Sequence, residues 1–234
     1  MSEPFSNLYV RTFDDLASAV ERFGFVPLFM NSIPGFSVEE HVAREAWFGS
    51  EPGVWEWKGP VIRTSGCAYG KFFEHKACFV SRDWFLDLAN YRRDGYDFDA
   101  LFDDELASYR DKELYDVLES RVPILSTDLK EVGGYRKGGK GSTAGGKKGF
   151  DTIMNRLQEQ GYALISDFVY LKDKNGNRYG WGVAEYSTPE QFFGPAFRAS
   201  VYRRTPEESY ARLVAHFKEL LPDAGEEAIK KILK

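Results

Sequence analysis

Residues 147–190 read KKGFDTIMNRLQEQGYALISDFVYLKDKNGNRYGWGVAEYSTPE, and this pattern predicts a helix followed by two strands. Over 146–160, apolar side chains recur at i, i+3, i+4 and i+7, as one buried helix face requires: Phe150, Ile153, Met154 and Leu157. The runs 162–173 and 178–187 then flank an Asn-Gly pair at 175–176, the strongest short signal for a β-hairpin. The stretch therefore predicts a helix packed against a two-stranded hairpin.

A short helix predicted at 126–133 extends this unit toward the N-terminus. From 122 to 187 the order is thus helix, helix and hairpin, which is typical of a winged helix whose second helix enters a DNA major groove. The outward face of that second helix is mixed in charge, with Asp151, Asn155, Arg156 and Glu159, whereas the hairpin carries Lys172, Lys174 and Arg178. Phosphate contacts position a protein without specifying a sequence, so we expect DNA affinity that falls steeply with salt. The alternative is a winged helix used for protein contacts or packing.

Charge is distributed unevenly along the chain, whose formal net charge is -5. Ten acidic residues and two basic ones lie between 94 and 119, whereas the loop 133–150, GGYRKGGKGSTAGGKKGF, carries five basic residues and no acidic one. The acidic segment repels a polyanion and the loop attracts one, although such a run is also common in loops that are simply solvated. The candidate DNA-binding residues are Arg136, Lys137, Lys140, Lys147, Lys148, Arg156, Lys174 and Arg178.

Other helix starts are marked by a Thr or Ser three positions before an acid or amide, the capping-box pattern: Thr12, Ser37, Thr188 and Thr205. Together with apolar periodicity, these starts predict helices at 12–23, 37–48, 81–93, 97–107, 111–120, 126–133, 146–160, 189–193, 205–220 and 226–233. The run 54–63, VWEWKGPVIR, alternates weakly and is broken by Gly59-Pro60, so we predict an edge strand or a loop there.

The predicted fold class is α+β and mainly helical, because no strand–helix alternation supports a doubly wound sheet. We expect a winged helix with a C-terminal hairpin wing, followed by terminal helices, and the sequence shows no internal repeat. The predicted domains are a helical and aromatic N-terminal domain at 1–120, a winged-helix domain at 121–200, and C-terminal helices at 201–234.

Composition excludes several classes of protein. A chain of 234 residues, 43% hydrophobic and 16% aromatic, can bury a core and is not disordered. No apolar run approaches the roughly 20 residues that cross a bilayer, and the first residues lack the pattern of a signal peptide. We therefore expect a cytoplasmic protein with no membrane partner, in which Cys67 and Cys78 are buried, reduced thiols.

The sequence contains no motif for a cofactor or a metal ion. Residues 141–147 fit G-x-x-x-x-G-K, but Lys148 stands where a P-loop needs Ser or Thr for magnesium. His41, His75 and His216 are distant in sequence, and no Cys/His cluster is present, so no metal site is expected. No nucleophile elbow is present either.

Aromatic residues are concentrated between 69 and 93, where bases and acids are threaded among them. Such interleaving is compatible with stacking on nucleotides, but it is more often simply a hydrophobic core, and both interpretations remain open from sequence. Within this stretch, His75 beside Glu74 is a candidate general acid/base or phosphate donor, or else an ordinary structural histidine.

Three landmarks occur in order along the chain: ERFGFVPLFMNSI (21–33), FFEHKACFVSRDWF (72–85), and the run from RVPILSTDLKE (121–131) to YGWGVAEYSTPE (179–190). They resemble the "Arg-x-Leu-Gly-x-Val-Gln" segment, the "Tyr-Trp-Ala-His-x-Ala" segment and the later winged helix of the AlkZ-like (YcaQ-type) DNA glycosylase family. The resemblance implies tandem winged-helix-like units, of which the one in the N-terminal domain (1–120) is abridged. His75 matches the family's histidine in the second landmark.

The same resemblance implies that the family's hydrolytic centre is missing. The family places Gln-x-Asp or Gln-x-Gln directly after Gly-x-Val, to position water and stabilise the cationic sugar, but here Pro27, Leu28 and Phe29 follow Val26. Neither proline nor phenylalanine can activate water. We therefore expect a binder of duplex or damaged DNA that is related to repair glycosylases.

Two alternatives remain open from the sequence. One is an active DNA glycosylase with a rearranged site, for which the candidate catalytic residues are Asn31, Glu74 and His75. The other is a module that does not bind DNA, in which the acidic segment 94–119 binds a basic protein or an aromatic pocket binds a small molecule.

Overall fold

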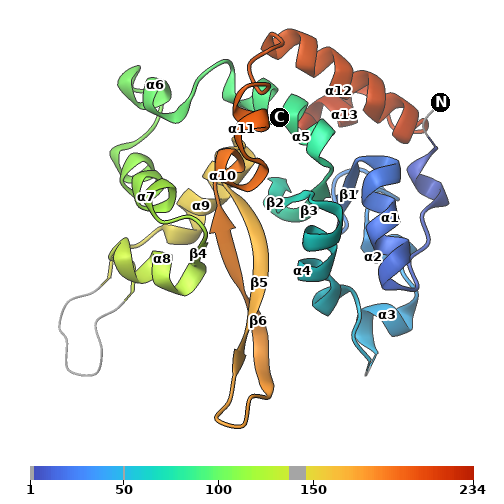
Figure 1. Ribbon diagram of the computed structural model, residues 1–234. Coiled ribbons are helices and arrows are strands. Elements are labelled where there is room, and N and C mark those ends of the chain that lie inside the picture. Colours follow the sequence, from blue (N-terminus) through green and yellow to red (C-terminus); the bar gives the residue numbers. More distant parts are fainter. Residues whose placement is uncertain (1–2, 50, 137–145) are drawn as a thin grey trace.

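The computed structural model describes residues 3–49, 51–136 and 146–234 (Figure 1). Up to residue 93 the elements are η1 (Phe5–Asn7), α1 (Phe13–Phe23), β1 (Phe25–Pro27), α2 (Val38–His41), α3 (Arg44–Phe48), α4 (Val54–Ser65), β2 (Ala68–Phe73), β3 (Lys76–Val80) and α5 (Arg82–Arg93). They continue with α6 (Phe98–Asp103), α7 (Tyr109–Ser120), β4 (Ile124–Leu125), α8 (Ser126–Val132), α9 (Phe150–Glu159), β5 (Leu164–Lys172), β6 (Arg178–Ser187), α10 (Pro189–Phe193), α11 (Pro195–Arg198), α12 (Pro206–Leu220) and α13 (Glu226–Leu233). The predicted α+β class with mainly helical content is confirmed. Within the described ranges, no helix is both long enough and apolar enough to cross a bilayer.

The strands form two antiparallel sheets that share one internal order. In the first sheet β3 lies between β1 and β2, and in the second β6 lies between β4 and β5, so the last strand in sequence is central in both. The preceding elements also follow one order: α1, β1, α2 with α3, and α4 lead into β2–β3, whereas α7, β4, α8 and α9 lead into β5–β6. The succession of elements therefore occurs twice, although the sequence shows no repeat.

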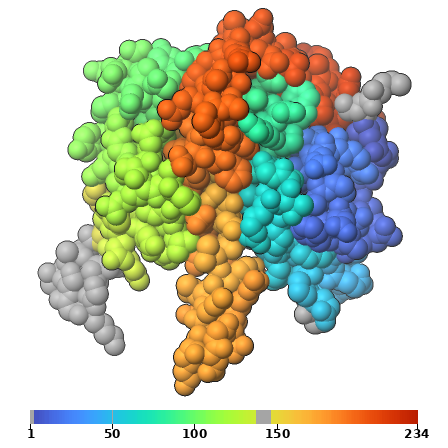
Figure 2. All heavy atoms as spheres, in the orientation of Figure 1, coloured from blue at the N-terminus to red at the C-terminus, as the bar shows by residue number. Residues whose placement is uncertain are grey.

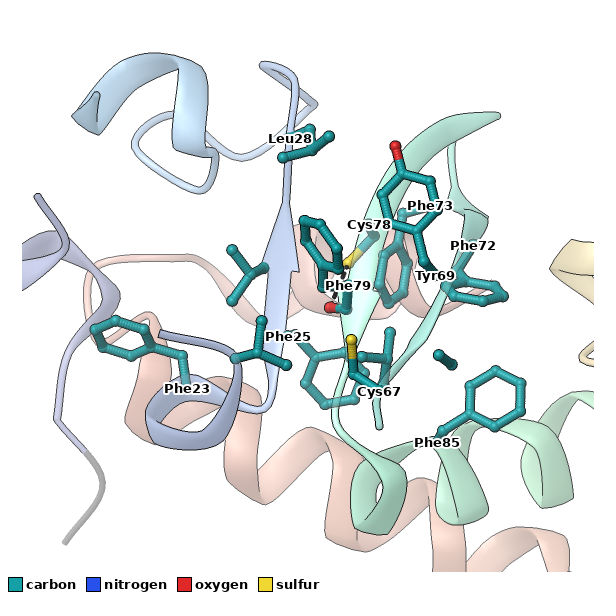
Figure 3. Packing of buried hydrophobic residues seen from close by; sticks show 14 of the residues in the cluster. Phe23, Phe25, Leu28, Cys67, Tyr69, Phe72, Phe73, Cys78, Phe79 and Phe85 are labelled. Atoms are coloured by element: carbon teal, nitrogen blue, oxygen red, sulfur yellow. Dashed lines mark hydrogen bonds between the residues drawn. The ribbon is translucent and has the colours of Figure 1, made fainter. Parts of the chain in front are cut away.

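The buried apolar side chains form two clusters. The larger one combines residues of 5–89 with the start of β5 and with residues 197–233, so that α12 and α13 complete a core begun near the N-terminus. Figure 3 shows its centre, where the side chains of Phe25, Phe73 and Phe79 lie beside the strands of the first sheet. The smaller cluster lies within residues 98–163. The aromatic residues of β2 and β3 thus belong to a core, which confirms the structural interpretation of that stretch.

Both cysteines are buried and free, as predicted. Burial raises the pKa of the Cys67 thiol to about 12, because the thiolate would lose its hydration. The Cys78 thiol is likewise raised well above its ordinary pKa by burial.

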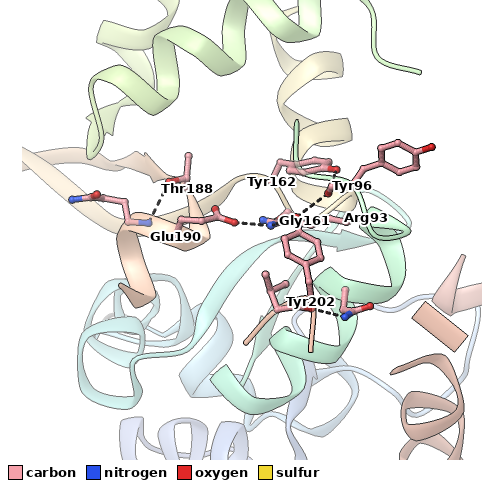
Figure 4. A network of polar contacts seen from close by, with 10 residues as sticks. Arg93, Tyr96, Gly161, Tyr162, Thr188, Glu190 and Tyr202 are labelled. Atoms are coloured by element: carbon pink, nitrogen blue, oxygen red, sulfur yellow. Dashed lines mark hydrogen bonds and ion pairs between the residues drawn. The ribbon is translucent and has the colours of Figure 1, made fainter. Parts of the chain in front are cut away.

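A polar network around Arg93 joins the two clusters (Figure 4). The Arg93 side chain, at the end of α5, donates to the Gly161 carbonyl and, over 2.6 Å, to the Glu190 carboxylate. Burial disfavours the charged guanidinium, but the Glu190 carboxylate more than offsets this and raises the pKa of Arg93. Tyr162 and Tyr202 both donate to the Tyr96 carbonyl beside it. A buried pair with these hydrogen bonds fixes the end of α9 against α5 and α10.

Helix α1 begins and ends as its sequence predicts. The Thr12 hydroxyl accepts from the Asp15 N–H over 3.2 Å, and the Asp15 carboxylate accepts from the Thr12 N–H, which completes the capping box. The helix ends at Gly24, whose φ of 77° lies in the left-handed region that favours glycine. The predicted helix starts at Thr188 and Thr205 are confirmed by the same type of hydrogen bond.

The predicted helix 37–48 is interrupted, and the reason is a contact that is distant in sequence. Val42 and Ala43 are extended, because Val10 pairs with this segment: its N–H donates to the His41 carbonyl and its carbonyl accepts from Ala43, both over 2.8 Å. Helical backbone hydrogen bonds are therefore replaced by pairing with a neighbouring segment, leaving the short helices α2 and α3.

The predicted edge strand or loop at 54–63 is wrong, because these residues form α4. The Glu56 carboxylate accepts from the Gly53 N–H over 3.0 Å and closes the helix start, and Pro60 lies inside the helix. Val54, Val61 and Ile62 are buried at a spacing that places them on one helix face. Their packing outweighs the usual effect of a proline at an interior position.

Strands β2 and β3 were missed by the sequence-based prediction, which contained a single hairpin. The turn between them consists of Glu74 and His75, whose φ angles are 50° and 59°. Two-residue hairpin turns of this form normally carry Asn-Gly or Asp-Gly, so the sequence gives no turn signal here.

Candidate nucleic-acid interface

The hairpin β5–β6 projects from the body of the molecule (Figures 1 and 2). Its base is buried at Leu164 and Ile165, whereas its tip is exposed. At the tip, the Asp173 carboxylate accepts hydrogen bonds from the backbone N–H groups of Asn177 (2.9 Å) and Asn175 (2.8 Å), which lower the pKa of Asp173. These bonds close the predicted Asn-Gly turn and give the projecting tip a defined shape.

Three basic side chains lie on this distal part. Lys172 ends β5, Lys174 lies in the turn and Arg178 begins β6, and all three are exposed. The Arg178 guanidinium lies 5.2 Å from the centroid of the Tyr170 ring, a cation–π contact that positions the charge without neutralising it. The structure therefore brings the basic residues predicted in the hairpin together on one exposed element.

Helix α4 lies beside the hairpin and forms a groove of about 350 Å³ with it. Arg63 of α4 and Asp167 of β5 form an ion pair in this groove. Nearby, the Lys58 amine lies 4.4 Å from the centroid of the Phe168 ring and 5.1 Å from that of Trp55. Burial lowers the pKa of Lys58, since the ammonium is partly removed from water.

The predicted basic loop is described only at its two ends. Lys137 and Lys140 lie outside the described residues. Arg136 is exposed and pairs with Glu131 over 2.8 Å. Lys148 is exposed, and no described carboxylate forms an ion pair with it. An exposed pair such as Arg136–Glu131 contributes only about 0–1 kcal/mol, so a phosphate group could compete with Glu131 for this arginine.

Two more of the predicted DNA-binding residues form ion pairs with acidic side chains of helix α7, which lies mostly in the acidic segment 94–119. The Lys147 amine lies 2.6 Å from a Glu113 carboxylate oxygen, and both side chains are partly exposed. The Arg156 guanidinium lies 3.1 Å from an Asp111 carboxylate oxygen that is almost completely buried. Because removing Arg156 would leave that buried carboxylate uncompensated, this arginine holds α9 against α7. The acidic segment thus lies next to one end of the basic loop.

The candidate catalytic residues have their polar atoms engaged in local structure. The Asn31 side chain donates to the Phe36 carbonyl over 2.6 Å and accepts from the Ile33 N–H over 2.9 Å, which fixes the loop after β1. The Glu74 carboxylate accepts from the Ser32 N–H over 3.2 Å and lies 3.6 Å from the Lys76 amine. Hydrogen bonding by the Ser32 side chain, together with the charge of Lys76, lowers the pKa of Glu74.

The remaining candidate, His75, connects the first hairpin to α9. Its Nδ1 lies 2.8 Å from a Glu159 carboxylate oxygen, which also accepts from the His75 N–H. The Asn31 loop and the Glu74–His75 turn are therefore neighbours, joined by the bond from Ser32 to Glu74. In the described ranges, no three His, Cys, Asp or Glu side chains gather as a metal site.

A set of aromatic side chains that no sequence pattern indicated meets beside the hairpin. Trp47 and Phe48 of α3, Trp55 of α4 and Trp181 of β6 line a cavity of about 530 Å³, which we name the aromatic notch. Trp47 and Trp55 are 5.3 Å apart between ring centroids, and Trp55 and Trp181 are 6.3 Å apart. Trp47 and Trp55 precede the first hairpin, whereas Trp181 lies more than a hundred residues later, so only the fold brings these rings together.

The notch lies next to Phe29, within the positions where the resemblance implies the catalytic motif of the family. Phe29, two residues beyond Pro27, packs against two rings of the notch, with centroid distances of 6.0 Å to Trp47 and 5.8 Å to Trp55. Its side chain is partly buried against the larger core. An aromatic ring thus stands where the resemblance implies a polar, water-positioning group.

The two sheets of matching order and the projecting hairpin define the class, a mainly helical α+β protein with exposed basic and aromatic side chains on and beside one hairpin. The family model described as AlkZ related matches residues 10–234, and the chain therefore belongs to the AlkZ-related family. The resemblance inferred from the three landmarks is confirmed, and it relates the chain to DNA-repair glycosylases. Comparisons with curated proteins and with solved structures give no match.

Proposed function

We propose that this protein binds duplex DNA through the hairpin β5–β6, the end of the basic loop at Lys148 and helix α9. The observation that carries the proposal is the projecting hairpin with three exposed basic side chains, Lys172, Lys174 and Arg178. Lysine and arginine on an exposed β-ribbon are suited to phosphate contacts along a groove.

We further propose that both halves of the chain are winged helices. The order helix, strand, helix, helix, strand, strand, with the last strand central in each sheet, supports this assignment in both units. In this scheme α4 and α9 are the third helices, and the turns at Glu74–His75 and at residues 173–177 are the wings. The outward face of α9 is mixed in charge. Its Asp151 pairs with Lys130 of α8, and its Arg156 pairs with Asp111 of α7, so DNA affinity would come mainly from phosphate contacts.

Duplex titrations at two salt concentrations test the DNA proposal. We expect binding at low salt that weakens steeply as salt rises, and we expect the double variant Lys172→Gln/Lys174→Gln to reduce the slope of log affinity against log salt by about two, roughly one per lost phosphate contact. The matched control is Lys230→Gln/Lys231→Gln, which removes the same charge from α13, at the opposite end of the molecule from the hairpin tip (Figure 1). Absence of binding at low salt, or an equal effect of the control, would contradict the proposal.

The position of Phe29 supports a second part of the proposal, namely that the hydrolytic centre of the related glycosylases is absent. Phe29 packs on Trp47 and Trp55 and offers no group that could position water. Incubation with DNA containing N-alkylated purines should therefore release no base and leave no abasic sites, as measured by chromatography and by alkaline strand cleavage. Base release that disappears in the variants Asn31→Ala or Glu74→Gln would instead show a rearranged catalytic site.

A further inference from the structure

The aromatic notch has two strongly exposed rings, Phe48 and Trp181, beside the packed rings of Trp47 and Trp55. Phe48 and Trp181 have 78% and 76% of their surface exposed, whereas Trp47 is buried and Trp55 is half-buried. Exposed large aromatic side chains that face one cavity are unusual on a protein surface unless something binds there. We propose that the notch stacks an unpaired nucleobase of bound DNA, an inference that rests on the proposed DNA binding.

The location of the notch supports a nucleic-acid occupant. Trp181 belongs to β6, the strand that begins with Arg178, so one wall of the notch is part of the same hairpin that is proposed to contact phosphates. The Lys58 amine lies 5.1 Å from the ring centroid of Trp55, which lines the notch, and 4.4 Å from that of Phe168 in β5. A base that leaves the duplex next to the hairpin would thus meet a ring face of the notch. The phosphates of its strand would lie near basic groups of the protein.

The ring geometry favours a flat occupant over an organic cation. A cation cage needs several ring faces turned toward one point with an open space between them. Here Trp55 already touches both Trp47 and Trp181 in tilted or edge-to-face contacts, at centroid distances of 5.3 and 6.3 Å, so no ion fits between the rings of either pair. Stacking requires only one free face, and the exposed ring of Trp181 provides it.

Two acidic side chains also line the notch, and neither prevents stacking. Glu56 already caps α4 through the Gly53 N–H, and Glu51 is exposed at the rim, where water screens its charge. They disfavour a phosphate inside the notch itself. A neutral base in the notch with its phosphates outside, toward the hairpin lysines, satisfies both sets of charges.

The experiment compares two short duplexes that contain the fluorescent base 2-aminopurine, one with this base unpaired in a single-nucleotide bulge and one with it paired to thymine. We expect the protein to bind the bulged duplex more tightly and to quench its fluorescence through stacking. Trp181→Ala should reduce that preference by about fivefold to a hundredfold, the range for loss of one stacked base. It should lower the affinity for the paired duplex by less than it lowers this preference, because phosphate contacts supply most of the duplex affinity, and melting curves should show that the exposed substitution preserves the fold.

The matched control is Tyr109→Ala, which removes an aromatic side chain of similar exposure, 74%, from the acidic segment 94–119. It should change neither affinity nor quenching.

Equal binding of the two duplexes by the unmodified protein, or an undiminished preference in Trp181→Ala, would overturn the inference while duplex binding stands. Failure to bind either duplex at low salt would overturn the proposed function and this inference together. A tryptophan fluorescence change with tetramethylammonium, lost in Trp181→Ala and unaccompanied by a base preference, would assign the notch to an organic cation and overturn the inference.

Discussion

Gly24 shows why single residues of the sequence landmarks matter for the fold. It ends α1 with a φ of 77°, and a Cβ atom at this position would lie 2.2 Å from Cδ1 of Trp84. Trp84 in turn stacks on His216 with centroids 3.9 Å apart. Gly24 and Trp84 belong to the first and second landmarks, so these two motifs meet at one packed contact, and α12 closes it.

Substitution of Gly24 by alanine should therefore be more damaging than the same change at a comparable helix end. Gly66 ends α4 with a φ of 60°, but a Cβ there would meet nothing within 4 Å. Gly66→Ala should lower the free energy of unfolding by about 1–2 kcal/mol, the usual cost of a left-handed alanine. Gly24→Ala adds overpacking against Trp84, for a total of about 2–5 kcal/mol. Urea unfolding measures both values, and equal losses would show that the contact with Trp84 relaxes freely.

Helix α12 depends on a histidine that is held neutral. His216 is buried, its Nε2 lies 2.8 Å from the Phe23 carbonyl oxygen, and its ring stacks on Trp84 of α5. Burial lowers the pKa of His216, although the hydrogen bond to Phe23 and the Glu219 carboxylate oppose this effect. The helix that completes the larger core is thus attached through a group that resists protonation.

The pH dependence of stability follows from that lowered pKa. The unfolded chain, with a histidine pKa of about 6.5, takes up the proton before the folded protein does, so the stabilisation is complete above that pH and is lost as the pH falls toward the folded pKa. The variant His216→Gln cannot be protonated and should show a flatter dependence between about pH 7.5 and 5.5 in urea unfolding. Parallel curves for the two proteins would contradict a neutral, buried His216.

Elements with strong local signals could be predicted from sequence. The hairpin β5–β6 follows from two apolar runs around Asn-Gly, and α1 and α12 follow from their capping boxes. The first hairpin could not be predicted in this way, because Glu74 and His75 occupy a left-handed turn without the usual glycine or asparagine. Helix α4 was missed for the opposite reason, since Pro60 signals a break that tertiary packing overrides.

At the scale of the whole molecule, the site was only partly predictable. The basic residues of the hairpin were identified by charge, but the pairing of Lys147 with Glu113 depends on α7 lying against the loop end, which no local pattern reveals. The aromatic notch combines rings of α3, α4 and β6, and their proximity arises from the packing of α4 on β5. The domain boundaries at 120 and 200, and the DNA contacts, stay predictions.

The larger core, built from both ends of the chain, also governs the order in which the protein can form during synthesis. All buried residues of the smaller core lie within residues 98–163, so these side chains can come together before the C-terminal part of the chain has been made, although β4 still needs its partner strand β6. The N-terminal segment leaves the ribosome earlier, but Phe25 and Phe73 lack the covering ring of Phe217 until α12 has been made. The contacts of the segment that includes Phe25 and Phe73 are therefore completed only after α12 has been made.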